Sequence, residues 1–61
     1  MGLHHRAVIR AFNKGDILVR KIVDIGFEWG TDWRNDVRVV SEVQRLEAVY
    51  DVVKVDVRDA G

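Results

Sequence analysis

Cysteine and proline are absent from this chain of 61 residues, and it has only two histidines, His4 and His5. Without cysteine no disulfide can form, which suits a reducing compartment. Adjacent histidines on a strand point to opposite faces, and a zinc site needs more ligands at defined spacing. We expect neither a metal nor a cofactor. Packing must therefore hold this small domain together.

Hydrophobic residues make up 48% of the chain, and this sets how far a single copy can be stabilised by burial. Folding a chain of this length buries roughly 6,000 Å². If about 60% of that area is apolar, burial contributes about 90 kcal/mol. Ordering the residues costs about 1.5 kcal/mol each, again about 90 kcal/mol in total. The balance for a monomer is close to zero, so we expect self-association to stabilise the fold.

An excess of charge of one sign is also missing, because ten lysines and arginines balance ten aspartates and glutamates. Nucleic-acid binders usually carry a basic stripe, since neutralising phosphates supplies much of their affinity. The one loose basic grouping consists of Arg6, Arg10, Arg20 and Lys21. Asp16 and Asp24 lie among these residues. Nucleic acid is therefore an alternative ligand and not the leading one.

Long apolar runs are missing too. No segment approaches the ~20 residues of a membrane-spanning helix. The first residues lack the apolar stretch and the cleavage site of a signal peptide. We expect a cytoplasmic protein with no membrane partner.

The residues from Asp16 to Trp29 alternate in character, with one parity apolar except for Lys21. That parity consists of Ile17, Val19, Val23, Ile25, Phe27 and Trp29. A period of two with β-branched and aromatic residues on one side predicts a half-buried strand. Gly26 within it predicts a bulge or a bend.

The segment before this strand has two interpretations. Residues 7–12 alternate and lead into Asn13-Lys14-Gly15-Asp16, which favours a hairpin with Gly15 in a left-handed conformation. A short helix that ends at Gly15 would instead place one apolar face on the N-terminal segment, made of Leu3, Ala7, Ala11 and Phe12. We favour the hairpin.

After Gly30 the apolar period becomes that of a helix. Its apolar side consists of Val39, Val40, Val43, Leu46 and Tyr50, and its polar side of Arg34, Arg38, Ser41, Glu42 and Arg45. Thr31 or Asp32 is expected to cap the N-terminus, and Arg38 and Glu42 are spaced for an ion pair. Valines at 53, 55 and 57 then alternate with charged residues and predict a last strand.

These elements predict an α+β fold in the order ββαβ, a small antiparallel sheet with one helix packed on one face. Residues 1–61 would form it as a single domain. One helix covers only one face of the sheet. On the other face Leu18, Ile22 and Val52 would interrupt the charged residues Arg20, Asp24, Lys54 and Asp56. Such a mixed surface suits a protein partner.

Two tryptophans and three acidic residues lie around the turn between the long strand and the helix. Trp29 and Trp33 flank it and either seal the core or anchor an interface. Glu28, Asp32 and Asp36 could do acid–base chemistry if one were desolvated, but acids near a helix N-terminus have a structural role. We expect no catalytic residue and no enzyme. The interface candidates are Leu18, Ile22, Val52, Trp29 and Trp33.

Residues 21–59 resemble the C-terminal half of an ACT domain, a small ferredoxin-like regulatory module. Lys21-Ile22-Val23-Asp24-Ile25 is similar to its third strand, and residues 40–49 and 52–57 are similar to its second helix and last strand. The resemblance implies pairing into larger sheets, often with an amino acid bound between subunits. We find no counterpart of the loop that holds the ligand in that family, so it implies no binding residues here.

The sequence therefore predicts a non-enzymatic, homo-oligomeric structural or regulatory module, with any small ligand bound between subunits. The alternative is a nucleic-acid-binding protein that uses Arg6, Arg10, Arg20 and Lys21 on the N-terminal hairpin.

Overall fold

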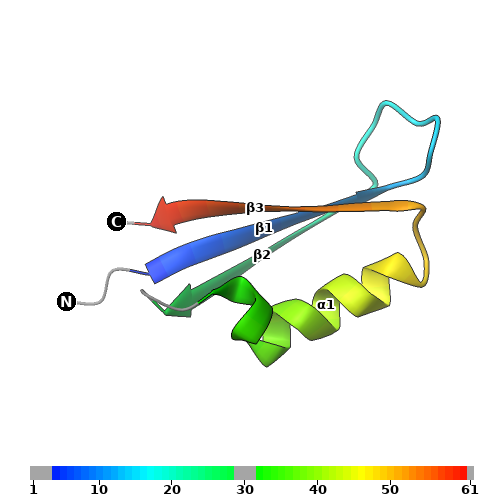
Figure 1. Ribbon diagram of the computed structural model, residues 1–61. Helices are drawn as coiled ribbons and strands as arrows, with labels where there is room; N and C mark the ends of the chain where they lie inside the picture. Colours follow the sequence, from blue (N-terminus) through cyan, green and yellow to red (C-terminus); the bar gives the residue numbers. More distant parts are fainter. Residues whose placement is uncertain (1–3, 29–31, 61) are drawn as a thin grey trace.

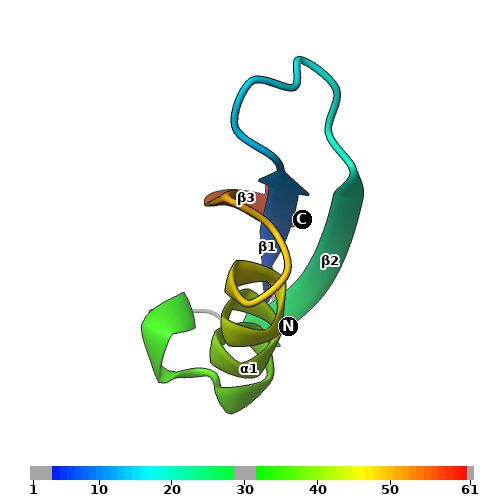
Figure 2. The same cartoon turned by 90° about the vertical axis from the view of Figure 1, so that its right-hand side faces the viewer.

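The computed structural model describes residues 4–28 and 32–60, which form three strands and one helix (Figure 1). The elements are β1 (His4–Phe12), β2 (Lys21–Glu28), a 3-10 turn η1 (Trp33–Asn35), α1 (Val37–Glu47) and β3 (Val52–Ala60). The sheet has the order β2-β1-β3, and β1 is antiparallel to both neighbours. Figures 1 and 2 show α1 on one side of this sheet. The predicted ββαβ arrangement is confirmed.

The pairing of β1 with β2 is regular, so of the bulge or bend predicted at Gly26 the bulge is wrong. The register runs from His4 opposite Glu28 to Ala11 opposite Lys21 without interruption, and Gly26 lies opposite Arg6. Among the described residues, the nearest atom to a Cβ on Gly26 would be the carbonyl oxygen of His5, at 4.0 Å. The strand therefore accepts glycine here without needing its conformational freedom.

The hairpin is confirmed over the competing helix, but β2 begins at Lys21 and not at Asp16. Residues 13–20 form a loop that turns at Gly15, whose φ is +94°, and the amide of Asp16 donates to the carbonyl of Asn13 over 2.9 Å. Positive φ at the third position of a turn favours glycine. The amide of Arg20 donates to the carbonyl of Ala11 over 3.0 Å and closes the loop.

The core lies between the sheet and α1. Alternate residues of β1 face the helix, and Ala7, Ile9 and Ala11 are fully buried. Val39 and Leu46 of α1 are buried against them. The remaining core contacts come from Phe27, Val23, Ile25, Trp33, Val43, Tyr50, Val53 and Val55. Val39, Val43, Leu46 and Tyr50 of the predicted apolar side therefore pack on the sheet, whereas Val40 is half-buried and does not belong to this cluster.

The start of α1 differs from the prediction. Asp32 caps η1 by accepting a hydrogen bond from the amide of Arg34, and Asp36 caps α1 through the amide of Arg38. Thr31 lies outside the described residues. The extra turn of η1 thus moves the helix cap four residues along the chain.

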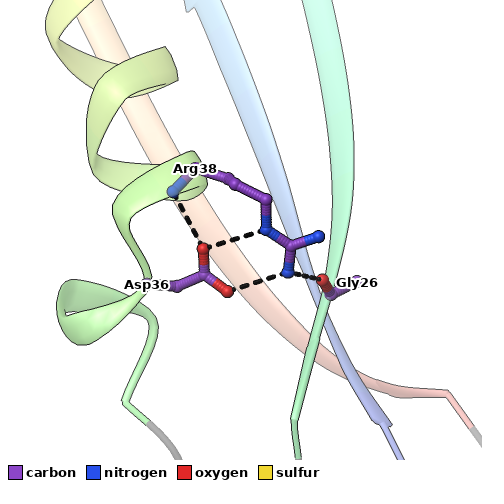
Figure 3. A network of polar contacts seen from close by, with 3 residues as sticks. All are labelled: Gly26, Asp36 and Arg38. Atoms are coloured by element: carbon purple, nitrogen blue, oxygen red, sulfur yellow. Dashed lines mark hydrogen bonds and ion pairs between the residues drawn. The ribbon is translucent and has the colours of Figure 1, made fainter.

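The predicted ion pair between Arg38 and Glu42 is also wrong. The guanidinium of Arg38 contacts Asp36 and the carbonyl of Gly26 (Figure 3), and Glu42 pairs with Arg45 over 3.4 Å. A cap carboxylate next to Arg38 and a strand carbonyl within reach together hold the guanidinium away from Glu42.

Candidate interaction surface

The sheet face opposite α1 is the surface that the fold leaves uncovered. In the described chain, the side chains that alternate with the core positions lie on it. We call this surface the open face, and it consists of Arg6, Val8, Arg10, Phe12, Ile22, Asp24, Gly26, Val52, Lys54, Asp56 and Arg58. It forms because α1 crosses the sheet on one side only (Figure 2).

Charges on the open face alternate in rows across the strands. The register places Arg6 beside Arg58, Val8 between Asp24 and Asp56, and Arg10 beside Lys54. Ion pairs connect the rows. Arg6 Nε lies 2.9 Å from Asp24 Oδ1, and Arg10 Nη2 lies 3.5 Å from Asp56 Oδ2. All four side chains are well exposed, so each pair stabilises the fold by at most about 1 kcal/mol.

The apolar part of the open face lies at the end of the sheet where β1 leads into the loop. Phe12 lies opposite Val52, and Ile22 lies opposite Arg10. Lys54 Nζ is 5.8 Å from the centre of the Phe12 ring, within the range of a cation–π contact. The side chains of this end therefore offer apolar and cationic groups side by side.

The loop of residues 13–20 extends this apolar end. Figures 1 and 2 show the loop rising on the side of the sheet away from α1. Ile17, Leu18 and Val19 in the loop are 97%, 66% and 42% exposed, and Ile22 on the adjoining strand is 60% exposed. Large apolar side chains gathered at one place on a surface indicate a binding site.

The structure separates the five interface candidates. Ile22 and Val52 share the open face but lie on opposite edge strands. Leu18 and Arg20 both lie in the loop, because β2 begins only at Lys21. The prediction that they are part of the sheet face is therefore wrong. Trp33 packs against the core on the helix side, so it does not join the others. Trp29 lies outside the described residues.

The four predicted basic contacts do not form one stripe either. Arg6 and Arg10 share the open face, whereas Arg20 lies in the loop, 3.2 Å from Asp16. Lys21 begins β2 opposite Ala11, on the parity that faces the helix. Two of the four residues therefore lie on the opposite side of the sheet or beyond its end.

Sequence reasoning missed that Lys54 and Arg58 join the basic residues of β1. Both lie on β3, opposite Arg10 and Arg6 respectively, because β3 pairs directly with β1. The described side chains of the open face thus include four cations and two anions. The alternation in β3 showed which residues share a face, but the neighbouring strand could be identified only from the fold.

Two residues of the acidic group around the turn, Asp32 and Asp36, are helix caps. Asp32 Oδ1 accepts from the amide of Arg34 over 3.1 Å, and Asp36 Oδ1 accepts from the amide of Arg38 over 2.9 Å. A side-chain hydrogen bond from Arg38 lowers the pKa of Asp36 below its ordinary value. The side chain of Glu28 lies outside the described part of the chain. Since a general acid needs a raised pKa, Asp36 is unsuited to that role.

Two other features bear on function. Within residues 4–28 and 32–60, no three His, Asp or Glu side chains come close enough to hold a metal ion. None of the helices formed by these residues is long and apolar enough to cross a membrane.

No family model, no curated protein and no solved structure matches this chain. The function must therefore be argued from its own residues.

Proposed function

We propose that the protein is a cytoplasmic, non-enzymatic module that assembles with copies of itself and serves a structural or regulatory role. Any small ligand would be bound between subunits. The observation that carries this proposal is the open face with its adjoining loop, where Ile17, Leu18 and Ile22 are each at least 60% exposed. Because α1 covers only the other face of the sheet, these three side chains remain exposed to water, and a second copy would cover them.

The accessible surface of the chain supports the same proposal. It amounts to 4455 Å², about a tenth more than the ~4,000 Å² expected for a folded monomer of this size. The extra exposed surface reduces the burial that stabilises one copy, and the free energy of folding of one copy is already expected to be close to zero. The resemblance of residues 21–59 to an ACT domain agrees with assembly, since that family pairs into larger sheets.

Nucleic-acid binding is the second candidate, and one observation favours it. Arg6, Arg10, Lys54 and Arg58 bring four cations to a face that holds only two described anions, Asp24 and Asp56. Both anions, however, already pair with arginines. If phosphates were the ligand, affinity for oligonucleotides would fall steeply with salt.

The test compares two replacements of an exposed apolar residue by lysine. Ile22→Lys changes the open face, and Val37→Lys changes α1, where Val37 is 75% exposed. Sedimentation velocity at micromolar concentration should show an assembly for the wild type and for V37K, and a smaller species for I22K. A wild-type monomer would contradict self-association. An unchanged I22K assembly would place the interface away from Ile22.

A further inference from the structure

The strand β3 forms one edge of the sheet and is long and regular. It pairs with β1 over nine residues, from Phe12 opposite Val52 to His4 opposite Ala60, with no interruption. The other side of an edge strand presents N–H and C=O groups that a further strand can pair with. Soluble proteins usually protect such an edge with proline, a bulge, a very short strand or charged side chains. Of these devices β3 has the charges alone, and their order decides which strand it can pair with.

The opposite edge, β2, is partly covered. Arg38 Nη2 donates to the carbonyl oxygen of Gly26 over 2.9 Å, and Asp36 holds the same nitrogen over 3.0 Å (Figure 3). A strand that approached β2 would have to displace this guanidinium. The two edges are therefore not equivalent, and β3 is the better site for pairing.

The side chains of β3 are complementary to a second, antiparallel copy of the same strand. If the two-fold axis passes through Val55, Lys54 lies directly opposite Asp56 of the second copy, and Asp56 lies opposite Lys54. On the helix side Val53 lies opposite Val57, and Val55 lies opposite itself. Opposite charges and β-branched residues are favourable cross-strand pairs. This pairing would also cover Val57, which is 47% exposed.

The same charges disfavour the register with the greatest overlap. Pairing of all nine residues would place the axis at Asp56, so that Asp56 faced its own copy. Lys54 would then face Arg58. Like charges directly opposite each other destabilise a strand pair.

An axis at Val57 is also less favourable. It pairs Asp56 with Arg58 of the second copy, but it sets Val55 against the carboxylate of Asp59. The axis at Val55 sets opposite charges across the two strands on one face and valines on the other, with Val52 opposite Arg58 at the ends of the overlap.

We propose that two copies of the chain pair antiparallel along β3, in the register centred on Val55, to form a continuous six-stranded sheet with three strands from each copy. The inference rests on the proposed self-association and assigns one of its contacts to the β3 edge. Ile22 and the loop lie at the other edge of the sheet and stay outside this contact, so I22K should still form the β3 dimer while losing any larger assembly. Because the axis is perpendicular to the sheet, both helices lie on one side and the two open faces join on the other.

The test uses two variants that repel themselves and attract each other. Lys54→Glu leaves positions 54 and 56 both acidic, and Asp56→Lys makes both basic. Each variant alone should weaken the dimer at least about tenfold, since two cross-strand pairs become repulsive. An equimolar mixture should regain the wild-type dimer, measured by sedimentation velocity. Arg45→Glu, on an exposed α1 side chain, is the matched control and should leave the mass unchanged.

Single cysteines provide a second test that keeps these charges intact, and the native chain has no cysteine to interfere. Val55→Cys faces itself across the axis with Cα atoms about 5.5 Å apart, within the range of a disulfide. Under oxidation it should form a covalent dimer. Val53→Cys faces position 57 of the second copy and should remain uncross-linked.

The outcomes separate this inference from the proposed function. If the wild type assembles and the two charge variants assemble equally well, or if V53C cross-links as readily as V55C, pairing along β3 is wrong and self-association remains. If the wild type is a monomer at micromolar concentration, both are wrong.

Discussion

Arg38 on α1 and Gly26 on β2 are joined by a hydrogen bond of 2.9 Å from the guanidinium Nη2 to the carbonyl oxygen. Asp36 orients the guanidinium, because its Oδ1 and Oδ2 accept from Nε and Nη2 over 3.3 and 3.0 Å. The same carboxylate caps the helix. One acidic side chain thus fixes both the start of α1 and its attachment to the sheet.

Replacing Arg38 by alanine should therefore destabilise the fold, although Arg38 lies on the polar side of the helix, where substitutions usually change stability by less than about 0.5 kcal/mol. Arg45→Ala is the control, because Arg45 lies on the same helix and its ion pair is local, with Glu42 three residues away. The unfolding midpoint in urea should fall more for R38A than for R45A. Equal midpoints would show that the contact with Gly26 contributes nothing.

The lowered pKa of Asp36 gives stability a defined pH dependence. The folded state keeps this carboxyl ionised to lower pH than the unfolded state, whose pKa is about 3.9. Its contribution is complete above that value and disappears as pH falls through the lower folded-state pKa. Asp36→Asn keeps a capping oxygen but cannot ionise. Urea midpoints measured from neutral pH downward should fall less steeply for D36N, and parallel curves would contradict the assignment.

The core should depend strongly on Leu46, which is 7% exposed and packs against the buried residues of β1. Leu46→Ala should cost about 2–5 kcal/mol of folding free energy. Since the free energy of folding of one copy is expected to be close to zero, this loss should unfold much of the protein. Val37→Ala, at a position of α1 that is 75% exposed, should cost less than about 0.5 kcal/mol. Circular dichroism during urea unfolding would measure both. Similar losses would mean that the helix is packed in a different rotation.

The two glycines of the hairpin should respond differently to alanine. Gly15 has a φ of +94°, where a Cβ atom is strained, so Gly15→Ala should cost roughly 1–2 kcal/mol. At Gly26 φ is ordinary and the nearest atom to a new Cβ is 4.0 Å away, so Gly26→Ala should be neutral or stabilising. Thermal unfolding of the two variants compares them directly. A G15A variant as stable as wild type would contradict the turn.

Periodicity in the sequence predicted the elements better than their ends. Val39, Val43 and Leu46 recur at helical spacing because one side of α1 packs on the sheet, and the structure confirms this side. The alternation that includes Ile17 and Val19 continues into the loop, so it could not show that β2 begins at Lys21. Residue types report which side chains would share a face, but not where the backbone turns.

The candidate surface was predictable only in part. Ile22 and Val52 were placed correctly on the uncovered face by parity. The rows of charge depend on β1 lying between β2 and β3, which local sequence does not encode. Likewise, η1 inserts a turn before α1, and Asp36 replaces Asp32 as the cap because of it.

In the proposed self-association, one copy of this chain is too weakly stabilised to remain folded alone. The most direct test of this proposal is the thermal midpoint over a hundredfold range of protein concentration, with the mass measured by sedimentation at each end. Association stabilises only the folded, assembled state, so the midpoint should rise with concentration as the mass rises. A compact monomer with the same midpoint at every concentration would contradict the account.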